Sequence, residues 1–337
     1  MQAGQAVLVI GKGRWRVAFS VKCVRYRTSW ASEECGRENP AFDFVSHWAT
    51  PIASLVSMLV STETLTSHLN DPRWVIFDCR HDLVDHGKGE KQYRDGHLPG
   101  AHFASVEQAL SGEKNGKNGR HPLPAPEAFT GFLARLGVTP ESTIVAYDDS
   151  GGLYAARLWW MVRWIGHRGA VLLDGGWSKW TAEGRATATA VPSPVPVAAW
   201  PVQVDTAAVW SAADVAAHLG DRACQLVDAR QAERFRGDVE AIDPVAGHIP
   251  GAVNRFYKAN LRADLTLRPA AELRGEFGEL LGARESKRVV HMCGSGITAC
   301  ANIFAMEYAG LSGSKLYAGS WREWVADPTR PVAKGAS

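Results

Sequence analysis

The residue of this chain best suited to covalent chemistry is a cysteine in a glycine-rich turn. Cys293 ends the apolar run RVVHMC and opens the turn CGSGIT, after which an apolar helical pattern begins. In an open parallel sheet, ligands bind at the carboxyl ends of the strands. The pattern therefore predicts that Cys293 lies in a binding position and acts as a nucleophile.

The turn after this cysteine predicts a cradle for an anion. Gly294 and Gly296 permit a tight loop whose N–H groups point inward. The next helix begins near Ile297 or Thr298 and adds unpaired N–H donors with a partial positive charge. Ser295 can add a hydroxyl donor, and Thr298 can cap the helix. These donors favour the thiolate and could hold a terminal persulfide sulfur.

The competing interpretation of Cys293 is that it is a small buried hydrophobic residue, as many free cysteines are. The same interpretation is preferred for Cys300, one heptad further along the helical pattern, and for Cys79 and Cys224, which lie in strand-like runs. The six cysteines of the chain are irregularly spaced, with no CxxC pair and no metal-ligand spacing. We therefore expect reduced thiols in a cytoplasmic protein.

An internal repeat weighs against a packing role for Cys293. Four motifs recur in the same order and at a similar spacing: WVIFDCR and CQLVDAR, DGHLPGAHF and AGHIPGAVN, STIVAYD and KRVVHMC, and DGGWSKW and AGSWREW. In the first copy, Asp148 stands at the position of Cys293, and a packing site would not readily take an aspartate. The repeat therefore predicts a duplicated domain with one active and one catalytically silent copy.

The elements that must position the turn follow from this repeat. In each half, short β-branched runs alternate with helical patterns, which is typical of a mostly parallel sheet flanked by helices. We expect a first, silent domain at residues 61–184, a proline-rich linker at 185–204 and a catalytic domain at 205–330. The prolines favour an extended connector. The predicted fold class is α/β, with two tandem domains.

Charge and length limit the partners of the chain. Its 337 residues suffice for two globular domains, and its 37 basic residues nearly balance its 35 acidic ones. This balance gives no reason to expect nucleic acid or a membrane surface as a partner. A small-molecule partner and a monomeric protein are the expectations that follow.

Residues 1–57 differ from the remainder of the chain. Basic residues gather between Lys12 and Arg27, and the first acidic residue is Glu33. A targeting presequence has this charge bias, but no amphipathic pattern accompanies it, and Met58 is an alternative start. We expect a non-catalytic or misassigned extension here, with a targeting signal as the alternative.

The motifs CGSGITA, GHIPGA, DGGW and GSWREW, in a duplicated frame, resemble the two-domain rhodanese and mercaptopyruvate sulfurtransferase family over residues 60–330. The resemblance implies two tandem rhodanese-like domains. It also implies that Cys293 takes a sulfane sulfur from a donor as a persulfide and passes it to an acceptor such as cyanide or a thiol. No metal or organic cofactor is implied.

The resemblance further implies roles for residues around the turn. Thiosulfate-using members have an Arg-Lys pair after the cysteine, whereas Gly294 and Ser295 stand there in this chain, as in the mercaptopyruvate type. In that type, a serine and an acidic residue of the first domain assist proton transfer to the leaving enolate. Here they are Ser295 and Glu107, although the family usually has Asp at the second position. His121, in RHPLP, also matches a family position, but a lone histidine in such a loop could be a surface residue.

Two arginines bind the donor in the mercaptopyruvate type, a task that suits the planar guanidinium group. Arg234, in ERFRG, matches the first of them. The second is expected before GHIPG, but VEAIDPVAGHIPG contains no basic residue, and Asp243 or Ala241 stands nearest. The resemblance therefore leaves the donor open between 3-mercaptopyruvate and thiosulfate.

Two other functions use similar parts. A phosphatase or arsenate reductase would need an arginine in its cysteine loop to bind the oxyanion, and no basic residue stands between Cys293 and Ala299. The second alternative is a sulfur-binding or partner-binding module without turnover, like the silent first domain. The presence of Cys293, Ser295 and Arg234 favours catalysis.

Overall fold

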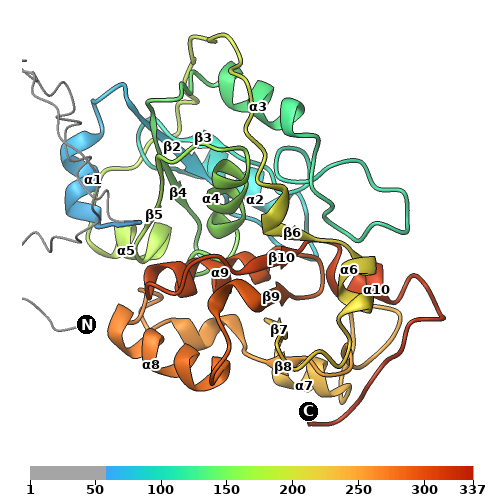
Figure 1. Cartoon of the computed structure of the whole chain (residues 1–337). Helices are drawn as coiled ribbons and strands as arrows, with labels where there is room; N and C mark the ends of the chain where they lie inside the picture. Colours follow the sequence, from blue (N-terminus) through green and yellow to red (C-terminus); the bar gives the residue numbers. More distant parts are fainter. Residues whose placement is uncertain (1–57, 337) are drawn as a thin grey trace, which may run out of the picture. The chain divides into compact units, whose positions relative to one another are not determined.

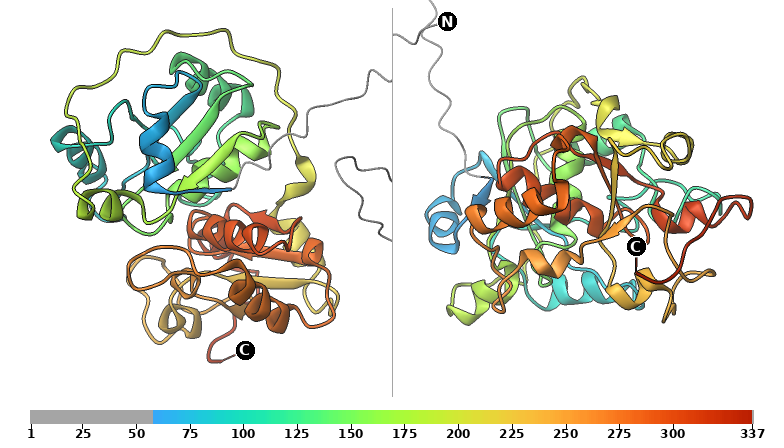
Figure 2. Two further views of the ribbon diagram at one scale, coloured as in Figure 1. Left: turned by 90° about the vertical axis from the view of Figure 1, so that its left-hand side faces the viewer. Right: turned by 60° about the horizontal axis from the view of Figure 1, so that its bottom comes forward.

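The computed structural model of the chain describes residues 58–336, which form two five-stranded sheets (Figures 1 and 2). Every strand pairs in parallel with its neighbours. The strand order is β1-β5-β4-β2-β3 in the first sheet and β6-β10-β9-β7-β8 in the second. The same order occurs twice, which confirms the duplicated α/β fold predicted from the repeated motifs.

The two halves contain matching sets of elements. The strands are β1 (Leu59–Val60), β2 (Trp74–Asp78), β3 (His102–Phe103), β4 (Thr143–Tyr147), β5 (Ala170–Leu173), β6 (Val209–Trp210), β7 (Gln225–Asp228), β8 (Val253–Asn254), β9 (Val289–Met292) and β10 (Lys315–Tyr317). The α-helices are α1 (Thr62–His68), α2 (Lys88–Asp95), α3 (Pro126–Arg135), α4 (Ala155–Trp164), α5 (Gly176–Ala182), α6 (Ala212–Ala217), α7 (Ala232–Arg236), α8 (Ala270–Leu281), α9 (Thr298–Tyr308) and α10 (Ser320–Trp324). Three short 3₁₀ helices complete the second half: η1 (Thr206–Ala208), η2 (Tyr257–Asn260) and η3 (Ser286–Arg288).

The central strands explain the position of the cysteine turn. β4 and β9 each lie third in their sheets, and helices cover both faces, so their sequences TIVAY and VVHM are almost wholly buried. β9 pairs with β7 on one side and with β10 on the other. The turn that follows β9 therefore lies in the middle of the sheet's carboxyl edge, where loops from neighbouring strands converge.

The two domains share an apolar core. Helix α4 of the first domain packs against α9 of the second, and the rings of Trp159 and Phe304 meet edge to face with centroids 5.0 Å apart. Nine residues of α4 are buried, among them Arg157. Because α9 begins directly after the cysteine turn, this packing brings first-domain residues against that turn.

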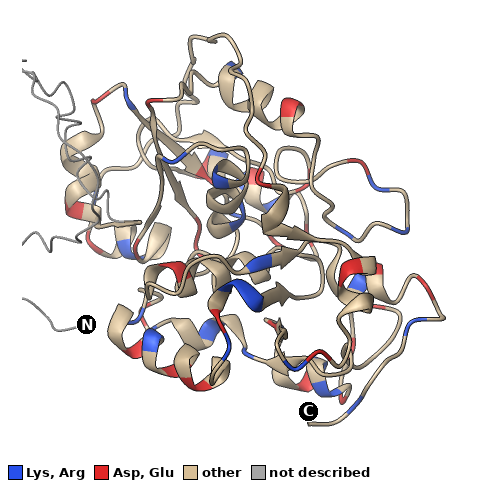
Figure 3. Cartoon of the chain, in the orientation of Figure 1, with Lys and Arg blue, Asp and Glu red and all other residues tan. Residues whose placement is uncertain are grey.

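The linker runs outside the first domain without helix or strand (Figure 2). Its backbone is nevertheless fixed by hydrogen bonds, such as those that join Ala188 to His97 and Val197 to Ala134. Figure 3 shows that acidic and basic residues are interspersed over both domains. No helix within residues 58–336 is long and apolar enough to cross a membrane. The extension expected at residues 1–57 lies outside the described residues.

Candidate active site

Cys293 lies directly after β9, and its side chain is 1% exposed. The backbone N–H groups of Ser295 and Gly296 point at its sulfur, with N···Sγ distances of 3.4 and 3.1 Å. Gly296 has a φ of 79°, and a side chain there would overlap the carbonyl oxygen of Ala318. The turn therefore directs two backbone dipoles at the sulfur, an arrangement that stabilises negative charge.

The AGSWREW motif holds this turn from the other side. The N–H of Cys293 donates to Ser320 Oγ at 3.1 Å. The N–H groups of Trp321 and Arg322 donate to the carbonyl oxygens of Cys293 and Gly294, both at 3.0 Å. Thus the start of α10 fixes the backbone of the cysteine turn. The repeat in the sequence identified this motif, but nothing in the sequence indicated that it hydrogen-bonds to the backbone of the cysteine turn.

The first domain holds a carboxylate where the second holds the thiol. Asp148, directly after β4, accepts hydrogen bonds from the N–H groups of Ser150, Gly152, Tyr154 and Ala155 at 2.7 to 2.9 Å. Burial raises the pKa of Asp148, and these hydrogen bonds oppose that shift. In both domains, backbone N–H groups of the turn after the central strand point at the side chain that follows the strand, but in the first domain that side chain is a carboxylate and not a thiol.

A chain of hydrogen bonds leads from the cysteine turn into the first domain. Ser295 Oγ lies 2.9 Å from His121 Nδ1, and His121 Nε2 lies 2.9 Å from Glu107 Oε1. Glu107 also accepts a hydrogen bond from Lys114 Nζ at 2.5 Å. His121 is 3% exposed and is therefore no surface residue. The structure brings together three side chains that the resemblance had linked, and the longer Glu107 side chain reaches its partner.

The ionisation of this chain follows from its surroundings. The hydrogen bond with His121, and then that with Lys114, hold the pKa of the Glu107 carboxyl well below its usual range. Burial lowers the pKa of His121, so its imidazole is neutral near pH 7. An ionised carboxylate only accepts, so His121 Nε2–H donates to Glu107. Nδ1 then carries the lone pair and accepts the hydroxyl hydrogen of Ser295.

A pocket of about 210 Å³ opens beside the turn. Five of the predicted site residues line it: Arg234, Gly294, Ser295, Ile297 and Thr298. Glu107 and His121 lie behind Ser295 and connect to the pocket through its hydroxyl group. The pocket therefore presents the cysteine turn and the guanidinium groups of Arg120, Arg230 and Arg234 to a ligand, with a polar relay behind them.

The surroundings of Arg234 differ from the expected pair of arginines. Its Nη2 donates to Glu240 at 2.8 Å and to Asp243 Oδ2 at 2.9 Å. Asp243 is buried, and burial raises the pKa of its carboxyl group. On its other side, Asp243 forms an ion pair with Arg120 of the first domain. An acidic side chain thus occupies the place where a second arginine was expected.

Two expectations about individual side chains were wrong. Thr298 does not cap α9: it is the first helical residue, and Ile297 occupies the cap position without a side-chain hydrogen bond. Ile297 is already in the right-handed helical region, so the chain enters the helix one residue earlier. Cys224 is not buried in a strand but is partly exposed just before β7, where its Sγ lies 3.4 Å from Asp221. Cys79 and Cys300 are buried as expected.

Sequence reasoning missed a buried cation next to the turn. Arg157, in α4, is 0% exposed and donates to the carbonyl oxygens of Gly296 at 3.3 Å and His121 at 3.0 Å. Arg157 therefore links the cysteine turn, through Gly296, to the segment of the first domain that contains His121. The signal in the sequence was a lone arginine within the apolar helical run AARLWWM. Arg120, which precedes His121 in RHPLP, was missed as well.

Among the residues that the structure describes, two clusters have side-chain atoms close enough to share a metal ion. One is His81, Glu107 and His121, and the other is His218, Asp221 and Cys224. Burial lowers the pKa of His81 to about 4, so it lies as a neutral ring beside Glu107. In the first cluster, two of the three members already form the relay behind Ser295. Spacing in the sequence had indicated neither cluster.

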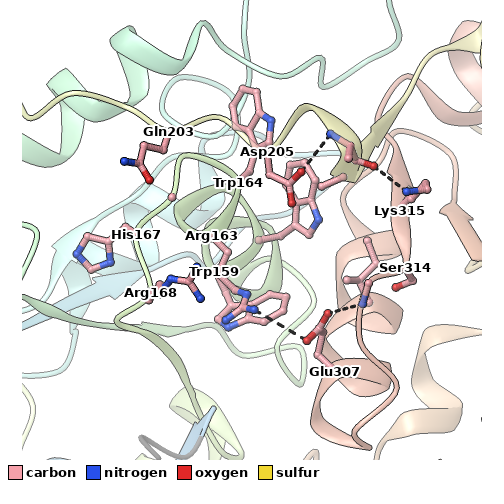
Figure 4. Close-up of a pocket in the computed structure, with 16 residues that line it drawn as sticks. Trp159, Arg163, Trp164, His167, Arg168, Gln203, Asp205, Glu307, Ser314 and Lys315 are labelled. Atoms are coloured by element: carbon pink, nitrogen blue, oxygen red, sulfur yellow. Dashed lines mark hydrogen bonds and ion pairs between the residues drawn. The ribbon is translucent and has the colours of Figure 1, made fainter. Parts of the chain in front are cut away.

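A larger cavity of about 480 Å³ lies between α4 and the edge of the second sheet (Figure 4). Its lining includes Trp159, Arg163 and Trp164 of α4 and Glu307 and Lys315 of the second domain. None of the site residues predicted from the sequence lines it. The larger of the two cavities is therefore not the candidate active site. The smaller one is, because the turn around Cys293 lies beside it.

A family model described as a rhodanese-like domain matches residues 61–183 and 211–327. The chain is 43% identical to a Pseudomonas aeruginosa protein named "Probable 3-mercaptopyruvate sulfurtransferase" over 281 residues, which are 83% of this chain and 99% of that protein. It is 33% identical to human 3-mercaptopyruvate sulfurtransferase over 294 residues, covering 83% of this chain and 97% of that protein.

The fold is also similar to a solved structure. The 3-mercaptopyruvate sulfurtransferase from Leishmania major superposes with a TM-score of 0.71 and 32% sequence identity, covering 80% of this chain and 74% of that chain. The residues that match the rhodanese-like family model, 61–183 and 211–327, fall in both domains.

Proposed function

The chain belongs to the rhodanese-like family, and on that premise we propose that it transfers sulfur from 3-mercaptopyruvate to a thiophilic acceptor through a persulfide on Cys293. It is a sulfurtransferase with a small-molecule donor and acceptor. The choice of 3-mercaptopyruvate over thiosulfate as the donor rests on the hydrogen-bonded relay of Ser295, His121 and Glu107. A relay for protons is needed when the leaving group is a carbon acid and is not needed when sulfite leaves thiosulfate.

In the first step, the Cys293 thiolate attacks the sulfur of 3-mercaptopyruvate. An S–S bond forms, the C–S bond breaks, and its electron pair moves onto the methylene carbon as the enolate of pyruvate. His121, neutral and accepting the Ser295 hydroxyl hydrogen at Nδ1, takes the thiol proton of the donor through Ser295 and returns it to that carbon. Pyruvate leaves, and the anionic persulfide remains within the N–H groups of Ser295 and Gly296.

In the second step, the acceptor removes the outer sulfur. Cyanide attacks that sulfur, the S–S bond breaks, and its electron pair returns to Cys293 as thiolate. A thiol acceptor reacts in the same way and leaves as its own persulfide. The two N–H groups 3.4 and 3.1 Å from the cysteine sulfur stabilise the thiolate that departs.

The test is thiocyanate formation from cyanide with either donor, in wild type, Cys293→Ser and Cys300→Ser. We expect a higher kcat/KM with 3-mercaptopyruvate than with thiosulfate, no turnover in Cys293→Ser, and retained turnover in Cys300→Ser. Mass spectrometry after treatment with the donor should show one added sulfur on the peptide that contains Cys293. Turnover that survives Cys293→Ser, or a preference for thiosulfate, would refute the proposal.

A further inference from the structure

We propose that His81, Glu107 and His121 of the first domain form a binding site for a divalent transition-metal ion such as Zn²⁺, and that the bound ion stops the proton relay. The site stands on the geometry of these side chains alone, whereas its effect on turnover rests on the proposed function. Two members of the relay thus have a second use, and His81 gains a role that the sulfur transfer itself does not give it.

The three side chains present their ligand atoms to one point. Glu107 Oε1 lies 2.9 Å from His121 Nε2 and 3.8 Å from His81 Nε2, and all three atoms lie within 4.8 Å of one another. Zn²⁺ holds nitrogen and oxygen ligands at about 2.1 Å, so the ligands of a tetrahedral site lie about 3.4 Å apart. Small movements of the side chains therefore bring all three atoms to ligand distance. Two imidazole nitrogens and one carboxylate oxygen are also a donor set that zinc enzymes use.

His81 contributes a buried nitrogen that lacks a partner. Its side chain is 3% exposed, and its Nε2 has no hydrogen-bond partner within residues 58–336. The 3.8 Å between this atom and Glu107 Oε1 is too long for a hydrogen bond. The rings of Tyr154 and His86 pack against the ring of His81, with centroids 5.2 and 5.5 Å away. A buried polar atom without a partner costs free energy, and a metal ion bound at this point satisfies it.

The cluster reaches solvent on the side of Glu107, whose side chain is 19% exposed. His86 Nδ1 lies 3.7 Å from Glu107 Oε1, and 53% of the His86 side chain is exposed, so this ring is free to turn in as a fourth ligand. Lys114 Nζ lies 2.5 Å from the other carboxylate oxygen, and its side chain is 43% exposed. The ammonium group can therefore move into solvent when a metal ion neutralises the carboxylate. The site thus has both an entry path and a fourth ligand.

A metal ion in this site reverses the hydrogen bond between His121 and Ser295. The ion takes the lone pair of Nε2, so the single proton of the neutral imidazole moves to Nδ1. Nδ1–H then donates to Ser295 Oγ, 2.9 Å away, and no lone pair is left to receive the thiol proton of the donor. Cys293 keeps the two N–H groups that point at its sulfur. Bound metal should therefore block turnover of 3-mercaptopyruvate and spare the formation of a persulfide from thiosulfate.

Binding is measured by calorimetric titration with ZnCl₂ on the full chain carrying Cys224→Ser and Cys293→Ser. These substitutions remove the thiols of the second cluster and of the turn. We expect one Zn²⁺ per chain, bound about a hundredfold more weakly after His81→Phe, which keeps a ring against Tyr154 but has no ligand nitrogen. His81→Gln is a second test variant, and His218→Gln, in the other cluster, is the matched control and should leave the affinity unchanged. Thermal unfolding shows which variants are folded, and Zn²⁺ should raise the Tm of the parent but not that of either His81 variant.

Co²⁺ in place of Zn²⁺ reports the ligand type. A site of imidazole and carboxylate ligands should give the visible bands of four-coordinate Co²⁺ without the near-ultraviolet charge-transfer band of a thiolate ligand. A thiolate band would place the ion on a cysteine and overturn the inference.

The effect on turnover is measured in wild type during the first turnover, with protein in excess over the donor and without cyanide, which would remove the metal. We expect Zn²⁺ to slow pyruvate release from 3-mercaptopyruvate by about a hundredfold, the usual contribution of an acid–base group. Sulfite release from thiosulfate should stay near its metal-free rate, and a chelator should restore pyruvate release. Without metal, His81→Phe should react as fast as wild type, and Zn²⁺ should not slow it.

The outcomes separate the two proposals. If metal-free wild type releases no pyruvate from 3-mercaptopyruvate, the proposed function fails, whereas the titrations still decide the metal site. If the parent binds no Zn²⁺, or if both His81 variants bind it as tightly as the parent, the function stands and the inference is overturned. Equal inhibition with both donors would overturn it too, because the ion would then act on Cys293. Binding that is lost with His81 and kept in His218→Gln, with inhibition confined to 3-mercaptopyruvate, supports it.

Discussion

The backbone and the side chain of Ser295 act on different partners. Its N–H points at the sulfur of Cys293, whereas its hydroxyl group lies 2.9 Å from His121 Nδ1. One residue thus contributes both to the anion cradle and to the proton relay. Because the two contributions come from different atoms, a substitution of the side chain separates them.

We expect Ser295→Ala to slow turnover of 3-mercaptopyruvate by about a hundredfold, the usual contribution of a positioned acid–base group. The backbone donors to Cys293 remain, so a persulfide still forms. Turnover of thiosulfate, whose sulfite leaves without a proton on carbon, should fall far less. Steady-state kcat with each donor in the cyanide assay measures the difference. Equal losses with both donors would show that the hydroxyl group acts in another way.

At this scale, the sequence and its family resemblance predicted the members of the turn and linked Ser295 to Glu107 and His121, but they did not predict the contact between Arg120 and Asp243. Cys293, Ser295 and the glycines are contiguous, and the order of the motifs placed them after a strand. The pair of Arg120 and Asp243 spans the domain boundary, and each residue alone resembles an ordinary surface charge. No local pattern encodes that contact, because packing of the two domains creates it.

At the scale of elements, the turn after the central strand directs backbone N–H groups at a side chain in both domains. In the second domain it surrounds a thiol, and in the first it surrounds the carboxylate of Asp148, which accepts four backbone hydrogen bonds. The repeat in the sequence predicted this correspondence. It could not predict that the carboxylate satisfies the N–H groups so fully, since that depends on the exact path of the loop.

We expect Asp148→Ala to lower the free energy of unfolding by about 3 kcal/mol or more, since buried N–H groups would lose their acceptor. Chemical denaturation measures this, with Asp149→Ala as the matched control. Asp149 is only partly buried and contacts the side chains of Gln92 and Ser150, so its loss should cost less. Thiocyanate formation by folded Asp148→Ala should match that of wild type. Unchanged stability would mean that the cradle does not depend on the carboxylate.

At the scale of the whole molecule, the central strand of the catalytic domain makes stability sensitive to pH. His291, in β9, is fully buried, and its Nδ1 has no hydrogen-bond partner within residues 58–336. Burial, and then the nearby charge of Arg255, lower the pKa of His291 from 6.5 to about 3. The unfolded chain therefore binds a proton below pH 6.5 that the folded chain binds only near pH 3, so acid favours unfolding over that range.

We expect His291→Leu to flatten this dependence. Between pH 7 and pH 5, the free energy of unfolding of wild type should fall by about 2 kcal/mol more than that of the variant, as follows from linkage. At pH 8 the histidine is neutral in both states, so the remaining difference reports packing and the contact of His291 Nε2 with Met306 Sδ at 3.1 Å. Urea unfolding at each pH provides the measurement. Parallel pH profiles would show that His291 remains neutral in the unfolded chain or is protonated in the folded one.

The first domain supplies side chains around a thiol that belongs to the second domain. Glu107, His121 and Arg120 all come from the half whose own turn carries Asp148. A substitution at any of these three positions of the first domain therefore changes the surroundings of a thiol that the second domain carries.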